Sequence, residues 1–290
     1  MYKRQAIWGE TELLQIDLPN IDNIKLWDEI VSNKRGIHKS NLLQCRHIVL
    51  ERYVFYQSHY ESLEEITPLD TQFWENIKED LHSCYGNNVA FSRARKKLLS
   101  SAPKCPYCLL NRPNTLDHYF DKSDYPEYSV FAPNLIPCCS ECNSLKGTRL
   151  FNDDQQRQFI HFYIDNIPNY QYLFVHFSID APKSIPQTFV DLQFQENEPL
   201  EQQIRNHFSQ LDLLRKFHDA IISRLPVVLG EIEIAKNGGM TFDQIQEIMR
   251  VRYRALASTY KGNYWETCMY EGLLSSEGVL EMFFHSERQE

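Results

Sequence analysis

The sequence has no long apolar run and no apolar stretch near its start. A helix that crosses a membrane needs roughly 20 consecutive, mainly apolar residues, and no segment of the 290 residues approaches that length. The first residues, MYKRQAIWGETELLQ, reach acidic side chains before the apolar centre of a secretory signal develops. We therefore expect a cytoplasmic protein with no membrane partner.

The sequence also lacks the positive net charge of a general nucleic-acid-binding protein. Its 39 aspartates and glutamates outnumber its 30 lysines and arginines, which gives a net charge of −9. Residues 89–150 are the exception, because nine basic and five acidic side chains make this segment +4 and leave −13 elsewhere. We expect this segment to contact nucleic acid. The candidate residues are Arg93, Arg95, Lys96, Lys97, Lys122, Lys146 and Arg149.

Cysteines are scarce outside one short segment. Three of the eight stand alone, whereas the other five lie between residues 105 and 142. Disulfides are rare in the cytoplasm, so this clustering indicates a metal. The pairs Cys105–Cys108 and Cys139–Cys142 each enclose two residues, the spacing at which two thiolates reach one tetrahedral zinc ion. Cys138 is an alternative ligand to Cys139, with a poorer spacing to Cys142.

The order of residue patterns predicts an α+β, mainly helical chain in three parts. Residues 1–88 show apolar residues at helical spacing. Residues 89–150 begin with a short basic helix that ends before Pro103, and then become irregular and rich in Pro, Asn and Cys. In residues 151–290 the segments 158–167, 170–180 and 187–195 are predicted to be strands or extended, and the rest helical.

The residues between the cysteine pairs point to a second site. Asp117-His118, Asn134 and Asn143 occur in the stretches LDH, NLIPCC and CSECN, which follow CPYC in that order. Together these stretches resemble the zinc-containing HNH endonuclease module over roughly residues 104–150. That module is a ββα-metal fold, in which a β-hairpin packs on a helix. The resemblance implies a metal-dependent endonuclease that hydrolyses DNA phosphodiester bonds.

The resemblance also implies a role for each of these residues. Asp117 and Asn143 would hold a catalytic Mg²⁺ or Mn²⁺ ion through oxygen atoms. His118 would take the proton of the attacking water. Asn134 would brace the loop that orients His118. The third position of the family pattern is often His, and the Asn found here favours a hard divalent ion.

The regions outside residues 89–150 suggest a protein partner. Their surplus of acidic residues repels nucleic acid, and the aromatic segment GNYWETCMYEGLLSSEGVLEMFF fits either a helix that closes a core or a partner interface. The layout resembles the HNH subunit of Septu-type anti-phage defence systems, which implies an ATPase partner. Two alternatives remain open: a non-catalytic zinc module that binds DNA or protein, and an HNH nuclease that acts on RNA.

Overall fold

The computed structural model describes residues 16–69, 72–86, 88–179, 186–276 and 278–285. These residues form two compact units that meet in sequence after residue 166. Helices dominate both units, and each unit contains one two-stranded antiparallel sheet, so the expected α+β, mainly helical fold is confirmed. None of the described helices is long and apolar enough to span a membrane. The segment MYKRQAIWGETELLQ lies outside the described residues.

Four helices begin the first unit, and side-chain caps start the first and the fourth of them. They are α1 (Asn23–Ser32), α2 (Gly36–Ser58), α3 (Gln72–Tyr85) and α4 (Val89–Ser100). The Asp22 side chain accepts a hydrogen bond from the Lys25 N–H at 2.9 Å, and Asn88 caps α4 in the same way. The predicted basic helix is α4, and it ends before Pro103 because proline cannot continue a helical hydrogen-bond ladder.

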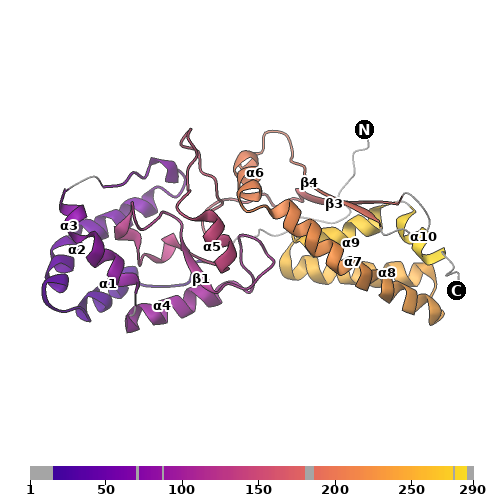
Figure 1. The fold of residues 1–290 in the computed structure, drawn as a ribbon, viewed down its shortest axis with the longest axis horizontal. Helices are drawn as coiled ribbons and strands as arrows, with labels where there is room; N and C mark the ends of the chain where they lie inside the picture. The colour runs from indigo at the N-terminus through magenta and orange to yellow at the C-terminus, as the bar shows by residue number, and fades with distance from the viewer. Residues whose placement is uncertain (1–15, 70–71, 87, 180–185, 277, 286–290) are drawn as a thin grey trace. The chain divides into compact units, whose positions relative to one another are not determined.

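The cysteine-rich segment folds as a hairpin followed by a short helix. Strands β1 (Thr115–His118) and β2 (Leu135–Cys138) pair antiparallel, with Asp117 opposite Ile136 and His118 opposite Leu135. Helix α5 (Ser140–Lys146) contacts β1, and α4 contacts both strands (Figure 1). The long connection between the strands contains the 3₁₀ turns Pro126–Tyr128 and Ala132–Asn134.

The first helices and the cysteine-rich segment share one core. Glu127, fully buried in the β1–β2 connection, accepts hydrogen bonds from Arg52 of α2 at 2.8 Å and from Trp74 of α3 at 3.3 Å. Composition placed boundaries after residues 88 and 150, whereas the compact unit extends to residue 166. The difference arises because the small hairpin buries its apolar side chains against the preceding helices.

Only two of the three segments of residues 151–290 that were predicted to be strands or extended form strands. They are β3 (Leu173–Ser178) and β4 (Gln187–Leu192), which pair antiparallel. Segment 158–167 instead follows an irregular path within the first unit, where the His161 ring packs 4.3 Å from that of Tyr119. Its aromatic side chains are buried by the first unit's core and not by a sheet.

Helices complete the second unit. They are α6 (Glu201–Gln210), α7 (Leu213–Asn237), α8 (Phe242–Tyr260), α9 (Trp265–Ser275) and α10 (Val279–His285). The aromatic C-terminal segment contains α9, whose buried side chains include Cys268 and Tyr270 and which packs on β3 and α8. Backbones approach closely here, because a Cβ on Gly272 would lie 2.2 Å from the Val175 carbonyl oxygen. Helix α9 therefore closes a core.

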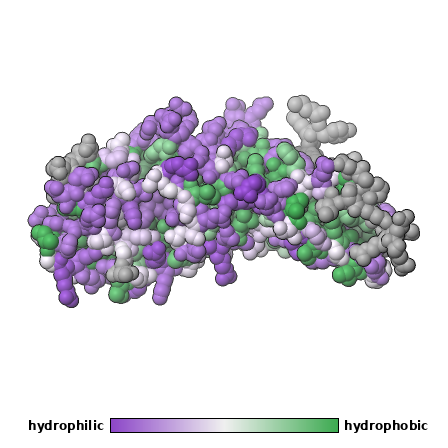
Figure 2. All heavy atoms as spheres, in the orientation of Figure 1, coloured by the Kyte–Doolittle hydropathy of each residue, from purple (hydrophilic) through white to green (hydrophobic). Residues whose placement is uncertain are grey.

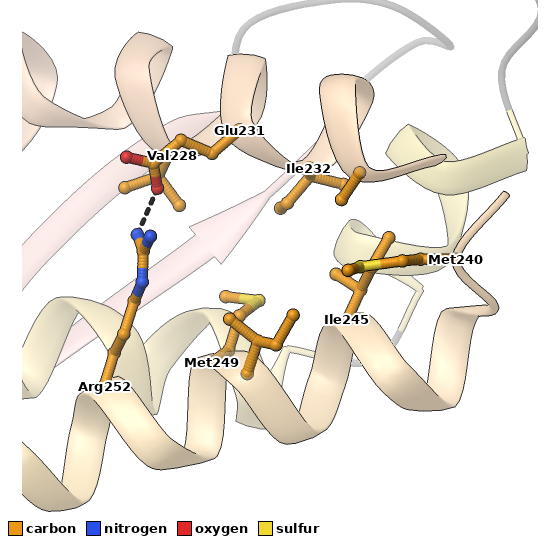
Figure 3. Close-up of a pocket in the computed structure, with 9 residues that line it drawn as sticks. Val228, Glu231, Ile232, Met240, Ile245, Met249 and Arg252 are labelled. Carbon is orange, nitrogen blue, oxygen red and sulfur yellow. Dashed lines mark hydrogen bonds and ion pairs between the residues drawn. The ribbon is translucent and has the colours of Figure 1, made fainter. Parts of the chain in front are cut away.

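A mainly apolar cavity lies between α7 and α8. Figure 3 shows Val228 and Ile232 of α7 facing Met249 of α8, with an ion pair between Glu231 and Arg252 at one end. The cavity contains no group of metal-binding side chains. Elsewhere, the face of the protein in Figure 2 is covered mainly by hydrophilic side chains, as expected when most apolar residues are buried.

Candidate metal centre and adjoining polar site

The four predicted cysteines form one cluster in the first unit. Cys105 and Cys108 lie in a tight turn after α4, Cys139 caps α5, and Cys142 lies within α5. All four are buried, and their sulfur atoms lie within 4.8 Å of one another. Sulfurs about 2.3 Å from a tetrahedral zinc ion would be about 3.8 Å apart, and the Cys108 and Cys139 sulfurs are 3.9 Å apart. The cluster can therefore bind a metal such as zinc.

The choice between Cys138 and Cys139 follows from the end of strand β2. Cys138 is the last residue of the strand, pairs with Thr115 and is buried outside the cluster. Cys139 leaves the strand, and its sulfur accepts a hydrogen bond from the Cys142 N–H at 3.5 Å. A one-residue change reverses the direction of a side chain in an extended segment, so only one of the two neighbours turns toward the cluster.

Two of the four thiols resist ionisation in the absence of a cation, whereas hydrogen bonds from neighbouring thiols lower the pKa of Cys108 and of Cys139. Without a metal, hydrogen bonding to neighbouring thiols and burial raise the pKa of Cys105 and of Cys142. A bound divalent ion reverses this effect because thiolates are its ligands. Among the residues that the structure describes, this is the one group of three or more His, Cys, Asp or Glu side chains close enough to share an ion.

Asp117 lies on β1 in a buried network next to the cysteine cluster. Its side chain is about 3% exposed, and one carboxylate oxygen accepts a hydrogen bond from the Tyr107 hydroxyl at 2.7 Å. The Lys146 Nζ lies 3.1 Å from both carboxylate oxygens and also donates to the His118 carbonyl at 2.9 Å. Burial raises the pKa of the Asp117 carboxyl, and the Lys146 charge opposes this shift.

From its sequence position, Lys146 was expected to contact phosphate at the protein surface, and the structure does not agree with this expectation. It lies on α5 with no exposed area, and its positive charge pairs with the Asp117 carboxylate inside the protein. The helix places it against β1 because positions 142 and 146 lie one turn apart, and Cys142 already faces the buried side. A solvent-exposed phosphate cannot reach its ammonium group in this arrangement.

His118 lies at the end of β1 and is half-buried. Its Nε2 lies 3.0 Å from the carbonyl oxygen of Ser129. Because a carbonyl only accepts, Nε2 carries the hydrogen and Nδ1 keeps its lone pair in the neutral ring. Burial lowers the pKa of His118 to about 4. The ring is therefore neutral near pH 7, and Nδ1 can accept a proton.

Asn134 is fully buried and ties the β1–β2 connection together. Its Oδ1 accepts a hydrogen bond from the Phe120 N–H at 2.8 Å, and its Nδ2 donates to the Phe120 carbonyl at 3.0 Å. A longer contact, 3.4 Å, joins Nδ2 to the Tyr128 carbonyl. This side chain links Phe120, two residues after His118, to the turn that immediately precedes Ser129.

The remaining predicted site residues are either half-buried or exposed. Asn143 is half-buried on α5, three residues before Lys146, and i and i+3 positions lie on the same side of a helix. Asn143 is therefore on the side of α5 that also carries Lys146. The basic residues Arg93, Lys96, Lys97 and Arg149 are exposed, whereas Arg95 and Lys122 are half-buried.

Sequence patterns did not identify two tyrosines at this site. Tyr107 stands inside the first cysteine pair, so its position next to a metal-binding turn was a usable signal. Tyr85 is the last residue of α3, and its ring centroid lies 4.5 Å from that of His118. Nothing in the sequence links Tyr85 to residue 118, because the contact depends on how α3 packs.

Comparison with known proteins gives one similarity at the level of sequence. The chain is 25% identical over 235 residues to protein ea31 of Escherichia phage lambda. The alignment covers 75% of this chain and 79% of that protein. No protein-family model and no solved structure matches the chain.

Proposed function

We propose that this protein is a metal-dependent endonuclease with an HNH-type ββα module, and that it hydrolyses phosphodiester bonds in DNA. One observation supports the proposal: Asp117 and His118 lie on β1 of a hairpin, Asn143 lies on the short helix α5 that contacts β1, and α5 also carries part of the four-cysteine cluster. The order β1, β2, α5 agrees with the module that the sequence resembles.

The donor atoms fit the two ions that the proposal requires. Cys105, Cys108, Cys139 and Cys142 would hold a structural zinc ion. Asp117 and Asn143 would hold Mg²⁺ or Mn²⁺ through one carboxylate and one amide oxygen, and each oxygen still has a lone pair beyond the hydrogen bonds described above. A divalent ion supplies charge that stabilises the phosphate and the leaving oxygen.

His118 has the geometry of a general base. The Ser129 carbonyl fixes its tautomer, so Nδ1 would take a proton from the water that attacks phosphorus. The bond from phosphorus to the 3′ oxygen then breaks, and that oxygen takes a proton from solvent. Asn134 would act as a positioning residue, because it holds the backbone that follows His118.

The test compares two histidine variants of the full chain. His118→Ala should abolish the nicking of supercoiled plasmid in Mg²⁺ or Mn²⁺ while zinc content and secondary structure stay unchanged. His47→Ala is the matched control, because His47 is exposed on α2 of the same unit. Equal activity in both variants, or no cleavage by the unaltered protein under any of these conditions, would reject the proposal.

The Asp117–Lys146 ion pair supports a second candidate function. A buried ion pair is a structural arrangement that needs no divalent ion, which favours a zinc module that binds DNA or protein without cleaving it. Binding of Mn²⁺ to the zinc-loaded protein separates the two functions. A second Mn²⁺-binding site that disappears in Asn143→Ala supports the nuclease, and the lack of any such site supports the binding module.

The substrate class and the cellular role form part of the same proposal. Phosphate contacts are the same in DNA and RNA, so cleavage of matched DNA and RNA strands decides between them. The layout that resembles a Septu-type subunit supports a role in anti-phage defence, with an ATPase as partner. Co-purification with an ATPase encoded next to the gene would test this role.

A further inference from the structure

Three segments of the first unit place charged and aromatic side chains around one ring, that of Tyr85. The His118 ring lies 4.5 Å from it, the Arg95 guanidinium lies 4.9 Å from its centroid, and the Lys122 ammonium lies 5.3 Å from its centroid. These residues come from α3, α4, the end of β1 and the connection after β1. We call these four residues the Tyr85 cluster.

Two hydrogen bonds of the Tyr85 hydroxyl group hold this side chain in place. The hydroxyl donates a hydrogen bond to the Leu116 carbonyl of β1 at 3.3 Å and accepts one from Arg95 at 3.0 Å. The tyrosine thus ties α3 and α4 to the strand that carries His118. All four members of the Tyr85 cluster are half-buried, so each keeps some area in contact with solvent.

The two cations of the cluster lack anionic partners. In the described part of the chain, neither Arg95 nor Lys122 forms an ion pair with a carboxylate. Arg93, two residues away on α4, does form one with Glu29 at 3.0 Å. The nearby carboxyl groups are Asp121, which acts on the pKa of His118, and Asp117, which Lys146 already neutralises.

Two cations without carboxylate partners, close to one tyrosine ring that also packs on His118, form an environment for an anion. A guanidinium donates several N–H groups in one plane, which suits phosphate oxygens, and an ammonium adds a second point of charge. We propose that Tyr85, Arg95 and Lys122 form a phosphate-binding site that holds the phosphodiester group of a nucleic acid at His118. This inference rests on the proposed function, and it makes α3 and α4 part of the active site.

The proposed site predicts different effects for substitutions at two arginines of the first unit. Arg95→Gln should lower the single-turnover rate constant for DNA cleavage by about 10²-fold, the size seen when one charge-stabilising donor is removed. The same variant should weaken DNA binding by only about fivefold, the effect of one lost phosphate contact. Arg112→Gln is the control, because Arg112 is exposed and is not among the candidate nucleic-acid contacts, so this variant should leave the rate constant unchanged.

Two further variants separate a positioning role from a general structural one. Arg95→Lys keeps the charge and should recover part of the lost rate, whereas loss of packing alone would not be rescued in this way. Tyr85→Phe keeps the ring but removes both hydroxyl hydrogen bonds, so the rate should fall while the KM for DNA stays nearly constant. Lys122→Gln provides a second test if Arg95→Gln fails to fold, as judged by zinc content and circular dichroism.

A binding measurement without cleavage separates this inference from the proposed function. In buffer without Mg²⁺ or Mn²⁺, inorganic phosphate should shift the ring NMR signals of His118, and the shift should vanish in Arg95→Gln but persist in Arg112→Gln. The shift without any cleavage would keep the phosphate site and reject the nuclease. Cleavage that falls equally in both arginine variants, with no phosphate-dependent shift, would overturn the phosphate site and leave the nuclease intact.

Discussion

Removal of the Asn134 side chain tests the link between a buried hydrogen-bond network and His118. Asn134→Ala leaves the Phe120 N–H and the Phe120 carbonyl without partners, and Phe120 has no exposed area. Each buried, unsatisfied polar group costs about 1–3 kcal/mol, so the first unit should lose about 2–6 kcal/mol of its free energy of unfolding. This is a large share of the roughly 5–15 kcal/mol that stabilises a typical domain.

Urea unfolding measures this loss. The fluorescence of the buried Trp27 and Trp74 reports the first unit when Trp265 of α9 is replaced by Phe in every variant, and zinc release to a chelating dye reports the cysteine cluster. Asn114→Ala is the matched control, because its side chain accepts a hydrogen bond from the Ser140 N–H at 2.8 Å in an exposed position. Water can replace that bond, so the control should lose about 1 kcal/mol or less. Equal losses in both variants would contradict the reasoning.

A change to aspartate at the same position should make stability depend on pH. Asn134→Asp keeps an acceptor for the Phe120 N–H, but it places a carboxylate oxygen near the Phe120 and Tyr128 carbonyls. Burial and these carbonyls favour the protonated acid, so its pKa rises on folding. Its stabilising contribution is then complete below the unfolded pKa of about 3.9 and is lost as pH rises through the folded value. Flat stability across this range would refute the assigned contacts.

Four further substitutions probe the metal site, the ion pair and the second unit. Cys142→Ser should lower zinc content below half an equivalent and abolish the cooperative unfolding of the first unit, whereas a well-folded, zinc-loaded variant would exclude the cluster as its main support. Lys146→Met leaves a buried carboxylate unpaired and should cost about 3–5 kcal/mol without divalent ions. Mn²⁺ should restore part of this loss, and no response to Mn²⁺ would argue against an ion site there. Gly272→Ala brings a Cβ within 2.2 Å of the Val175 carbonyl oxygen and should lower thermal stability by about 1–3 kcal/mol. Gly230→Ala, whose Cβ meets nothing within 4 Å, should instead stabilise α7 by up to about 1 kcal/mol, and the opposite order of Tm values would show the close backbone contact to be wrong.

Local patterns in the sequence were sufficient to predict the cysteine pairs and most of the helices. The spacing of Cys105 and Cys108 restricts both sulfurs to one turn, so their meeting depends on few other residues. Likewise, α4 follows from its apolar spacing, its Asn88 cap and a proline beyond its end. The resemblance to a nuclease module was also carried by short, ordered motifs, and cleavage itself stays a prediction.

The tertiary structure decided which of the polar residues meet. Lys146 pairs with Asp117 inside the protein because α5 packs on β1, and a lysine in a sequence carries no sign of such burial. Tyr85 reaches His118 across 33 positions of sequence by way of helix packing. Residues 158–167 have the aromatic, alternating pattern of a strand, but they pack irregularly in the first unit's core. An alternation of apolar and polar residues indicates which side chains are buried, but it does not indicate whether a sheet or another element buries them. Spacing along the chain determines local contacts, whereas contacts between distant segments depend on how whole elements share a core.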